Sequence, residues 1–113
     1  MTQYSLGFVN EGKSFEIPRW TVKKHEELLK EMIPFDEQVK LGVLTKVNYD
    51  KIFHMKMILS SLHEIDKNVT EQQISELHPD DFMELIYAVY NSGKKGIVIN
   101  NNVDFRQGEK KPL

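Results

Sequence analysis

The side chains with the most potential for chemistry are the histidines and the pairs of adjacent acidic residues. Adjacent acids point apart on a helix, so none of these pairs forms a general acid/base pair. No second histidine or carboxylate recurs at the spacing of metal ligands. The sequence therefore predicts neither a catalytic site nor a metal site from His25, His54, His63, His78, Glu26-Glu27, Asp36-Glu37 and Asp80-Asp81.

Two of the histidines have a structural interpretation. His25 lies in the apolar arc of a predicted helix, where we expect a hydrogen-bonded histidine at the edge of the core. His78 precedes Pro79 and is expected to cap a turn.

Sequence motifs of common enzymes are also missing. The chain has no Gly-rich phosphate loop, no Gly-x-Ser-x-Gly turn and no His-Glu-x-x-His motif. It has no cysteine, which removes disulfides, thiolate zinc sites and cysteine nucleophiles and is compatible with a reducing cytoplasm. We therefore expect a protein that is not an enzyme and binds no cofactor.

A basic and aromatic cluster lies at the start of the first predicted helix. Arg19, Trp20, Lys23 and Lys24 could contact phosphate or stack on a base. A solvated helix start explains them better, because the formal net charge of the chain is -2 and gives no global attraction to nucleic acid. A small DNA-binding regulator stays open as an alternative.

The first residues predict a β-hairpin. Tyr4, Leu6 and Phe8 alternate with polar or small residues, a Gly-containing turn follows, and the alternation resumes from Phe15 to Ile17 before Pro18. A two-stranded hairpin is only marginally stable, so its apolar face must pack on other elements or on another subunit.

Helical periodicity and capping residues predict four helices after the hairpin. The last of them has only a narrow polar edge and is expected to be the most buried helix. The segment between the first two has mixed periodicity and is treated as a connector. The capping and stop residues are Thr21 and Pro34 for the first helix, Asn48 for the second, Thr70 with Gln73 for the third, and Pro79 and Gly93 for the last.

The second predicted helix carries two apolar stripes. One runs from Ile52 to Ile65, and Tyr49, Phe53 and Met57 form the other. Such a helix usually lies between two layers, which favours a central position. The alternative is that Tyr49, Phe53 and Met57 form an exposed partner-binding surface.

After Gly93, the residues Ile97, Val98 and Ile99 could form one short strand, either paired with the hairpin or left as an edge for a partner. The predicted fold class is therefore α+β. It consists of an N-terminal β-hairpin and a mostly helical domain over residues 1–105, with a flexible tail over 106–113. No signal peptide or membrane span is predicted, so we expect a soluble protein.

Three stretches resemble the small tail assembly chaperones of long-tailed bacteriophages that infect Gram-positive hosts. They are "SFEIPRWTVKKHEELLKEM", "HPDDFMELIYAVYNSGKKG" and "VDFR". The resemblance implies a mainly helical protein that binds the tape measure protein, keeps its hydrophobic segments soluble and helps to recruit tail-tube subunits. It also implies a location in the host cytoplasm and absence from the mature virion.

The resemblance also implies a role for the codons of the C-terminal residues. Such chaperones are made in two lengths when ribosomes slip by one nucleotide, and the codons of Glu109, Lys110 and Lys111 could form the slippery run. A second such run could lie at Lys94 and Lys95. A basic tail that only increases solubility is the simpler alternative.

Other interpretations also stay open. A virion component, such as a head-tail connector or tail-completion protein, would form a stable ring and remain in particles. Self-association is conceivable in either case because the predicted hairpin has a free edge.

Overall fold

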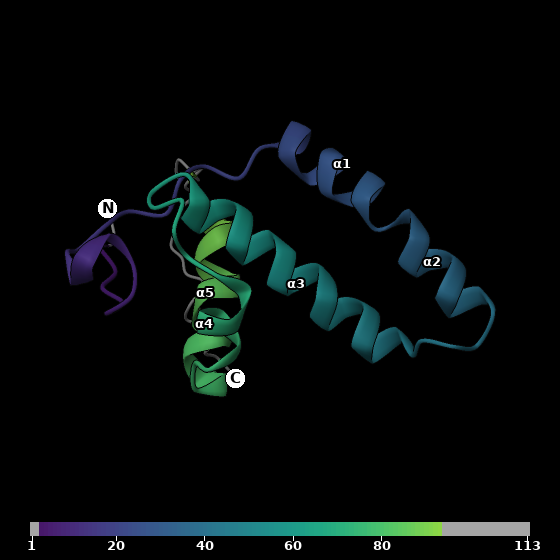
Figure 1. Ribbon diagram of the computed structural model, residues 1–113. Helices are drawn as coiled ribbons and strands as arrows, with labels where there is room; N and C mark the ends of the chain where they lie inside the picture. Colours follow the sequence, from purple (N-terminus) through teal and green to yellow (C-terminus); the bar gives the residue numbers. More distant parts are fainter. Residues whose placement is uncertain (1–2, 94–113) are drawn as a thin grey trace, which may run out of the picture.

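The computed structural model describes residues 3–93, and within this range it contains helices but no strand. The helices surround a single hydrophobic core, and a short 3-10 turn, η1, precedes them (Figure 1). Their bounds are Asn10–Gly12 for η1, Val22–Glu31 for α1, Ile33–Lys40 for α2, Lys46–His63 for α3, Glu71–Ser75 for α4 and Pro79–Asn91 for α5.

The predicted N-terminal β-hairpin is wrong, and with it the assignment to the α+β class. Tyr4 and Phe15 exchange two backbone hydrogen bonds of 2.8 Å, but this antiparallel bridge is isolated within residues 3–93. The next ladder pair in this register is Leu6 and Lys13, and its groups are used elsewhere. Lys13 N–H donates to the carbonyl of Asn10 at 3.1 Å, and the carbonyl of Leu6 accepts from Val9 N–H at 3.0 Å.

The alternation that predicted the hairpin still describes which side chains face inward. Tyr4, Leu6 and Phe8 pack against the core, and Phe15 is buried in it. The N-terminal segment therefore contributes apolar side chains to a helical core without forming a sheet.

The central helix is α3, as its two apolar stripes predicted. It contacts α1, α2, α4 and α5. In Figure 1 it runs between the α1–α2 pair and the pair of α4 and α5. Six of its 18 residues are buried, against four of 13 in α5, so the last helix is not more buried than α3, contrary to the prediction.

The first predicted helix is α1, and a further helix, α2, follows it directly from Ile33. Pro34 was expected to stop it, but Pro34 lies in the first turn of α2, where its missing N–H would have no helical partner in any case. The break falls at Met32, which has φ −85° and ψ −4°. The first half of the predicted connector, residues 35–40, therefore belongs to α2.

Most predicted helix ends are confirmed. Thr21 accepts a hydrogen bond from Lys24 N–H, and Thr70 forms a capping box with Gln73. Gly93 follows the C-cap of α5 with φ +74°, a left-handed conformation that glycine adopts without the strain it causes in L-residues. Asn48 is wrong as an N-cap, because Thr45 takes that position and accepts from Asn48 N–H at 3.1 Å.

Among residues 3–93, no helix is both long enough and apolar enough to cross a lipid bilayer.

Candidate protein-binding surface

Large apolar side chains reach the surface in several places. On α5, Met83, Tyr87 and Tyr90 are 46%, 59% and 45% exposed, and we call these three residues the α5 stripe. The α2–α3 loop and the start of α3 expose Leu41, Val43 and Val47 by 76%, 73% and 76%. The remaining exposed large apolar residues in the described range are Val22, Leu29 and Ile33.

The α5 stripe is a continuous surface. Its members are spaced at i, i+4 and i+7, so they lie on one side of the helix. The opposite side of α5 is buried, with Leu85 and Val89 in the core. One helix thus presents apolar side chains both to the core and to the surface.

Tyr90 connects the α5 stripe to the interior through a series of aromatic rings. The Tyr90 ring lies 6.2 Å from that of His54, edge to face, and His54 lies 5.9 Å from Phe53. The series continues through His25 to Trp20, whose Nε1–H donates to His25 Nδ1 at 3.2 Å. Through these contacts the Tyr90 end of the stripe packs on His54, which packs on the buried Phe53.

Burial affects ionisation along this series of rings. It lowers the pKa of His54, and the negative charge of Asp50 partly opposes this effect. It raises the pKa of Tyr90, to which Asp50 adds. Both rings are therefore held in their neutral forms near pH 7.

The first turns of α5 are acidic. Asp80, Asp81 and Glu84 are all exposed, and α5 contains no lysine or arginine. Asp80 and Asp81 lie in the first turn of the helix, where a negative charge interacts favourably with the helix dipole. His78 Nδ1 accepts from Asp80 N–H at 3.1 Å, which confirms the prediction that His78 is a cap.

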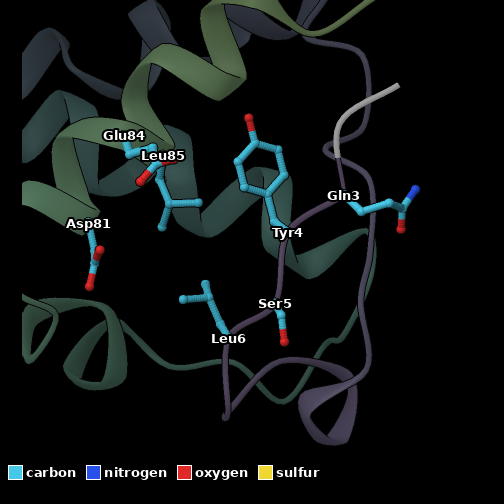
Figure 2. Close-up of a pocket in the computed structure, with 7 residues that line it drawn as sticks. All are labelled: Gln3, Tyr4, Ser5, Leu6, Asp81, Glu84 and Leu85. Carbon is cyan, nitrogen blue, oxygen red and sulfur yellow. The ribbon is translucent and has the colours of Figure 1, made fainter.

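Two of these acids border a cavity of about 280 Å³ between α5 and the N-terminal segment (Figure 2). Asp81 and Glu84 line the α5 side, and Tyr4 and Leu6 line the other. Burial and the charge of Glu84 both raise the pKa of Tyr4. The cavity therefore combines two carboxylates with apolar side chains and with the polar side chains of Gln3 and Ser5.

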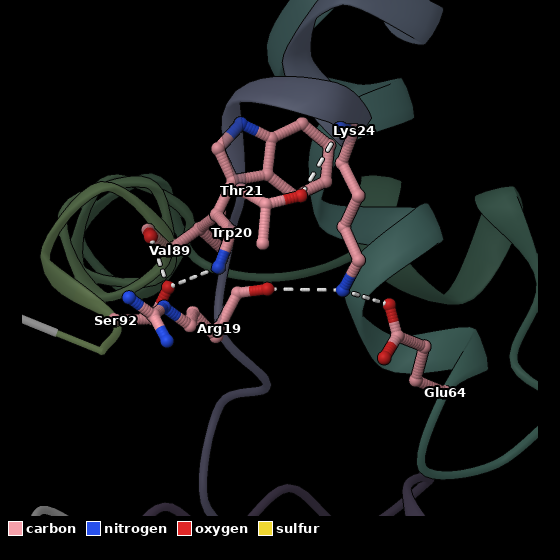
Figure 3. Close-up of polar contacts among 7 residues, drawn as sticks. All are labelled: Arg19, Trp20, Thr21, Lys24, Glu64, Val89 and Ser92. Carbon is pink, nitrogen blue, oxygen red and sulfur yellow. Dashed lines mark hydrogen bonds and ion pairs between the residues drawn. The ribbon is translucent and has the colours of Figure 1, made fainter.

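The basic cluster at the start of α1 connects this helix to the ends of α3 and α5 (Figure 3). Trp20 N–H donates to Ser92 Oγ at 2.8 Å, and Ser92 Oγ donates to the carbonyl of Val89 at 2.6 Å. Lys24 Nζ donates to the carbonyl of Arg19 at 2.9 Å and forms an ion pair with Glu64. Lys24 is thus engaged within the fold, which weakens the DNA-binding alternative.

The histidines have local partners within the described chain. His25 is hydrogen-bonded at the edge of the core, as predicted, and His63 Nε2 donates to the carbonyl of Val69 at 2.7 Å. Among residues 3–93, no group of three or more histidines and acids is arranged to hold a metal ion.

The predicted partner-binding residues of α3 are not on the surface. Tyr49, Phe53 and Met57 are 8%, 8% and 0% exposed. The prediction that they form an exposed surface is therefore wrong, because α3 is covered on both apolar sides. The other predicted sites, Ile97, Val98 and Ile99 and the frameshift residues Glu109, Lys110 and Lys111, lie outside the described residues.

Sequence reasoning missed the α5 stripe. The sequence did indicate it, since α5 has more apolar residues than fit on one buried side of a helix. That excess was taken as a sign of deep burial. Whether a second layer covers the helix depends on tertiary packing, and among the helices of residues 3–93 only α3 makes extensive contact with α5.

The chain was also compared with known proteins. It matches no protein-family model, and no curated protein or solved structure is significantly similar to it.

Proposed function

We propose that this protein is a phage tail assembly chaperone that binds the tape measure protein through the α5 stripe and keeps it soluble, without catalysis. The observation that carries the proposal is the continuous stripe of Met83, Tyr87 and Tyr90. Contiguous exposed apolar surface on a small protein is typical of a protein-binding site.

The chemistry of the α5 stripe suits an amphipathic partner. Methionine adapts to irregular surfaces, and tyrosine supplies a large apolar face with a polar tip. Apolar contacts at i, i+4 and i+7 match the repeat of an amphipathic helix laid along α5. A chaperone for long hydrophobic segments needs such contacts and no reactive groups.

The sequence resemblance supplies the identity of the partner. It supports the tape measure protein as the client and tail-tube subunits as a second contact. In this proposal the protein acts in the cytoplasm of the host bacterium and leaves before the virion is complete.

Co-expression with the tape measure protein tests the proposal. We expect the tape measure protein to stay soluble and to co-purify with this chain, and to precipitate when this chain is omitted. If the tape measure protein precipitates in both cases and this chain purifies with finished particles, a virion component is the correct assignment.

A pair of matched variants tests the role of the α5 stripe. The double variant Met83→Ser/Tyr87→Ser should reduce co-purified tape measure protein by about tenfold, since losing two partly buried contacts costs roughly 1 kcal/mol or more. The control variant Leu41→Ser/Val43→Ser removes a similar amount of exposed apolar surface from the α2–α3 loop. Equal loss in both variants would contradict a specific role for α5.

A further inference from the structure

The α5 stripe has an acidic border. Asp80 precedes Met83 by three residues, and Glu84 precedes Tyr87 by three, so both carboxylates lie beside the stripe on the exposed side of the helix. Both residues are exposed. A partner that covers the stripe must therefore bring its own edge close to these two charges.

Charge is unevenly distributed along α5. Its first turns carry Asp80, Asp81 and Glu84, whereas Arg19 packs against Gly93 beyond the other end. The acidic end therefore favours a cationic group on the partner, and the Arg19 end does not.

We propose that the segment bound by the α5 stripe is an amphipathic helix whose apolar side is flanked by lysine or arginine residues, which pair with Asp80 and Glu84. This inference rests on the proposed function and names the chemistry of the client segment. A helix flanked by acids would place like charges against the same carboxylates. A neutral helix would lose the electrostatic attraction and keep only apolar contact.

The neighbouring cavity strengthens the charge argument. It opens beside Glu84 and is lined by Asp81, Tyr4 and Leu6 (Figure 2). Its volume of about 280 Å³ is sufficient for one long side chain. A lysine or arginine can lay its aliphatic stem against Tyr4 and Leu6 and keep its charged end at the carboxylates.

Two synthetic peptides test the inference. Both carry the same leucine and alanine positions over about five helical turns, and they differ only in having lysine or glutamate at the flanking positions. Binding to the full-length protein is measured by fluorescence anisotropy. Two exposed ion pairs predict about tenfold tighter binding of the lysine peptide.

Salt and charge reversal identify the source of that preference. The preference should shrink as salt is raised from about 0.1 M to about 1 M, where the screening length falls from about 10 Å to about 3 Å. The variant Asp80→Lys/Glu84→Lys should favour the glutamate peptide instead. The control variant Glu26→Lys/Glu27→Lys makes the same charge change on α1 and should leave the preference unchanged; circular dichroism confirms that both variants are folded.

The outcomes separate this inference from the proposed function. Equal binding of both peptides, or a preference that charge reversal does not move, overturns the inference even if the tape measure protein is still held in solution. If the wild-type protein holds neither the peptides nor the tape measure protein, the proposed function fails as well. If sedimentation shows a dimer that Glu84→Lys dissociates, a second copy occupies the stripe, and the inference is wrong.

Discussion

At the scale of single residues, His54 is the group that most closely couples the candidate surface to the core. Its ring lies between Phe53 and Tyr90, so it has a buried neighbour on one side and a member of the α5 stripe on the other. Burial disfavours its charged form. Protonation of this residue therefore opposes the packing of α3 against α5.

The stability of the protein should depend on this histidine at mildly acidic pH. The pKa of His54 in the folded state is below its ordinary value of 6.5, so the unfolded chain binds the proton more readily. Its contribution is complete above pH 6.5 and is lost as the pH falls through that value toward the folded pKa. Urea unfolding across this range should show a decline that His54→Gln reduces.

An NMR titration of the His54 ring provides the direct check. A folded-state pKa at or above 6.5 would contradict the account. The His54→Gln variant also assigns the signal, because the protein contains three other histidines.

Sequence reasoning is most successful at this scale where a residue acts on its immediate neighbours. Thr21, Thr70 and His78 cap helices as predicted, since a cap needs only the next few residues. Asn48 was wrong because Thr45 offers an equivalent side chain one turn earlier. Both residue types are good caps, and local sequence does not decide between them.

At the scale of elements, α3 organises the structure. Its two apolar stripes predicted a central helix correctly, and they also explain why Tyr49, Phe53 and Met57 are unsuitable as an open surface. The hairpin prediction was wrong because side-chain pattern alone does not determine strand pairing. Alternation predicted the inward direction of Tyr4, Leu6 and Phe8, but strand pairing also requires backbone donors, and Lys13 N–H donates to the carbonyl of Asn10 and not across to Leu6.

Phe53 should be a stability residue rather than a binding residue. Phe53→Ala should lower the free energy of unfolding by about 3–5 kcal/mol, a large part of the stability of a typical domain. Tyr87→Ala, on the exposed stripe, should change it by no more than about 0.5 kcal/mol. Chemical denaturation of both variants makes the comparison, and a folded Phe53→Asp variant would show that the residue is not in the core.

At the scale of the whole molecule, the N-terminal segment and the five helices share one core, and α5 lies at its edge. A mostly helical single core was predictable from periodicity and caps. The location of the exposed apolar surface was not, because α3 and α5 are both rich in apolar residues. Only their relative placement decides that the stripe on α3 is covered and the stripe on α5 is open.

The most direct test of the central claim is site-specific photo-crosslinking during co-expression with the tape measure protein. A photoreactive phenylalanine analogue replaces Tyr87 in one variant and Val43, in the α2–α3 loop, in the other. We expect a crosslink to the tape measure protein from position 87 and little or none from position 43. Crosslinking from position 43 alone, or from neither position while the complex still forms, would contradict it.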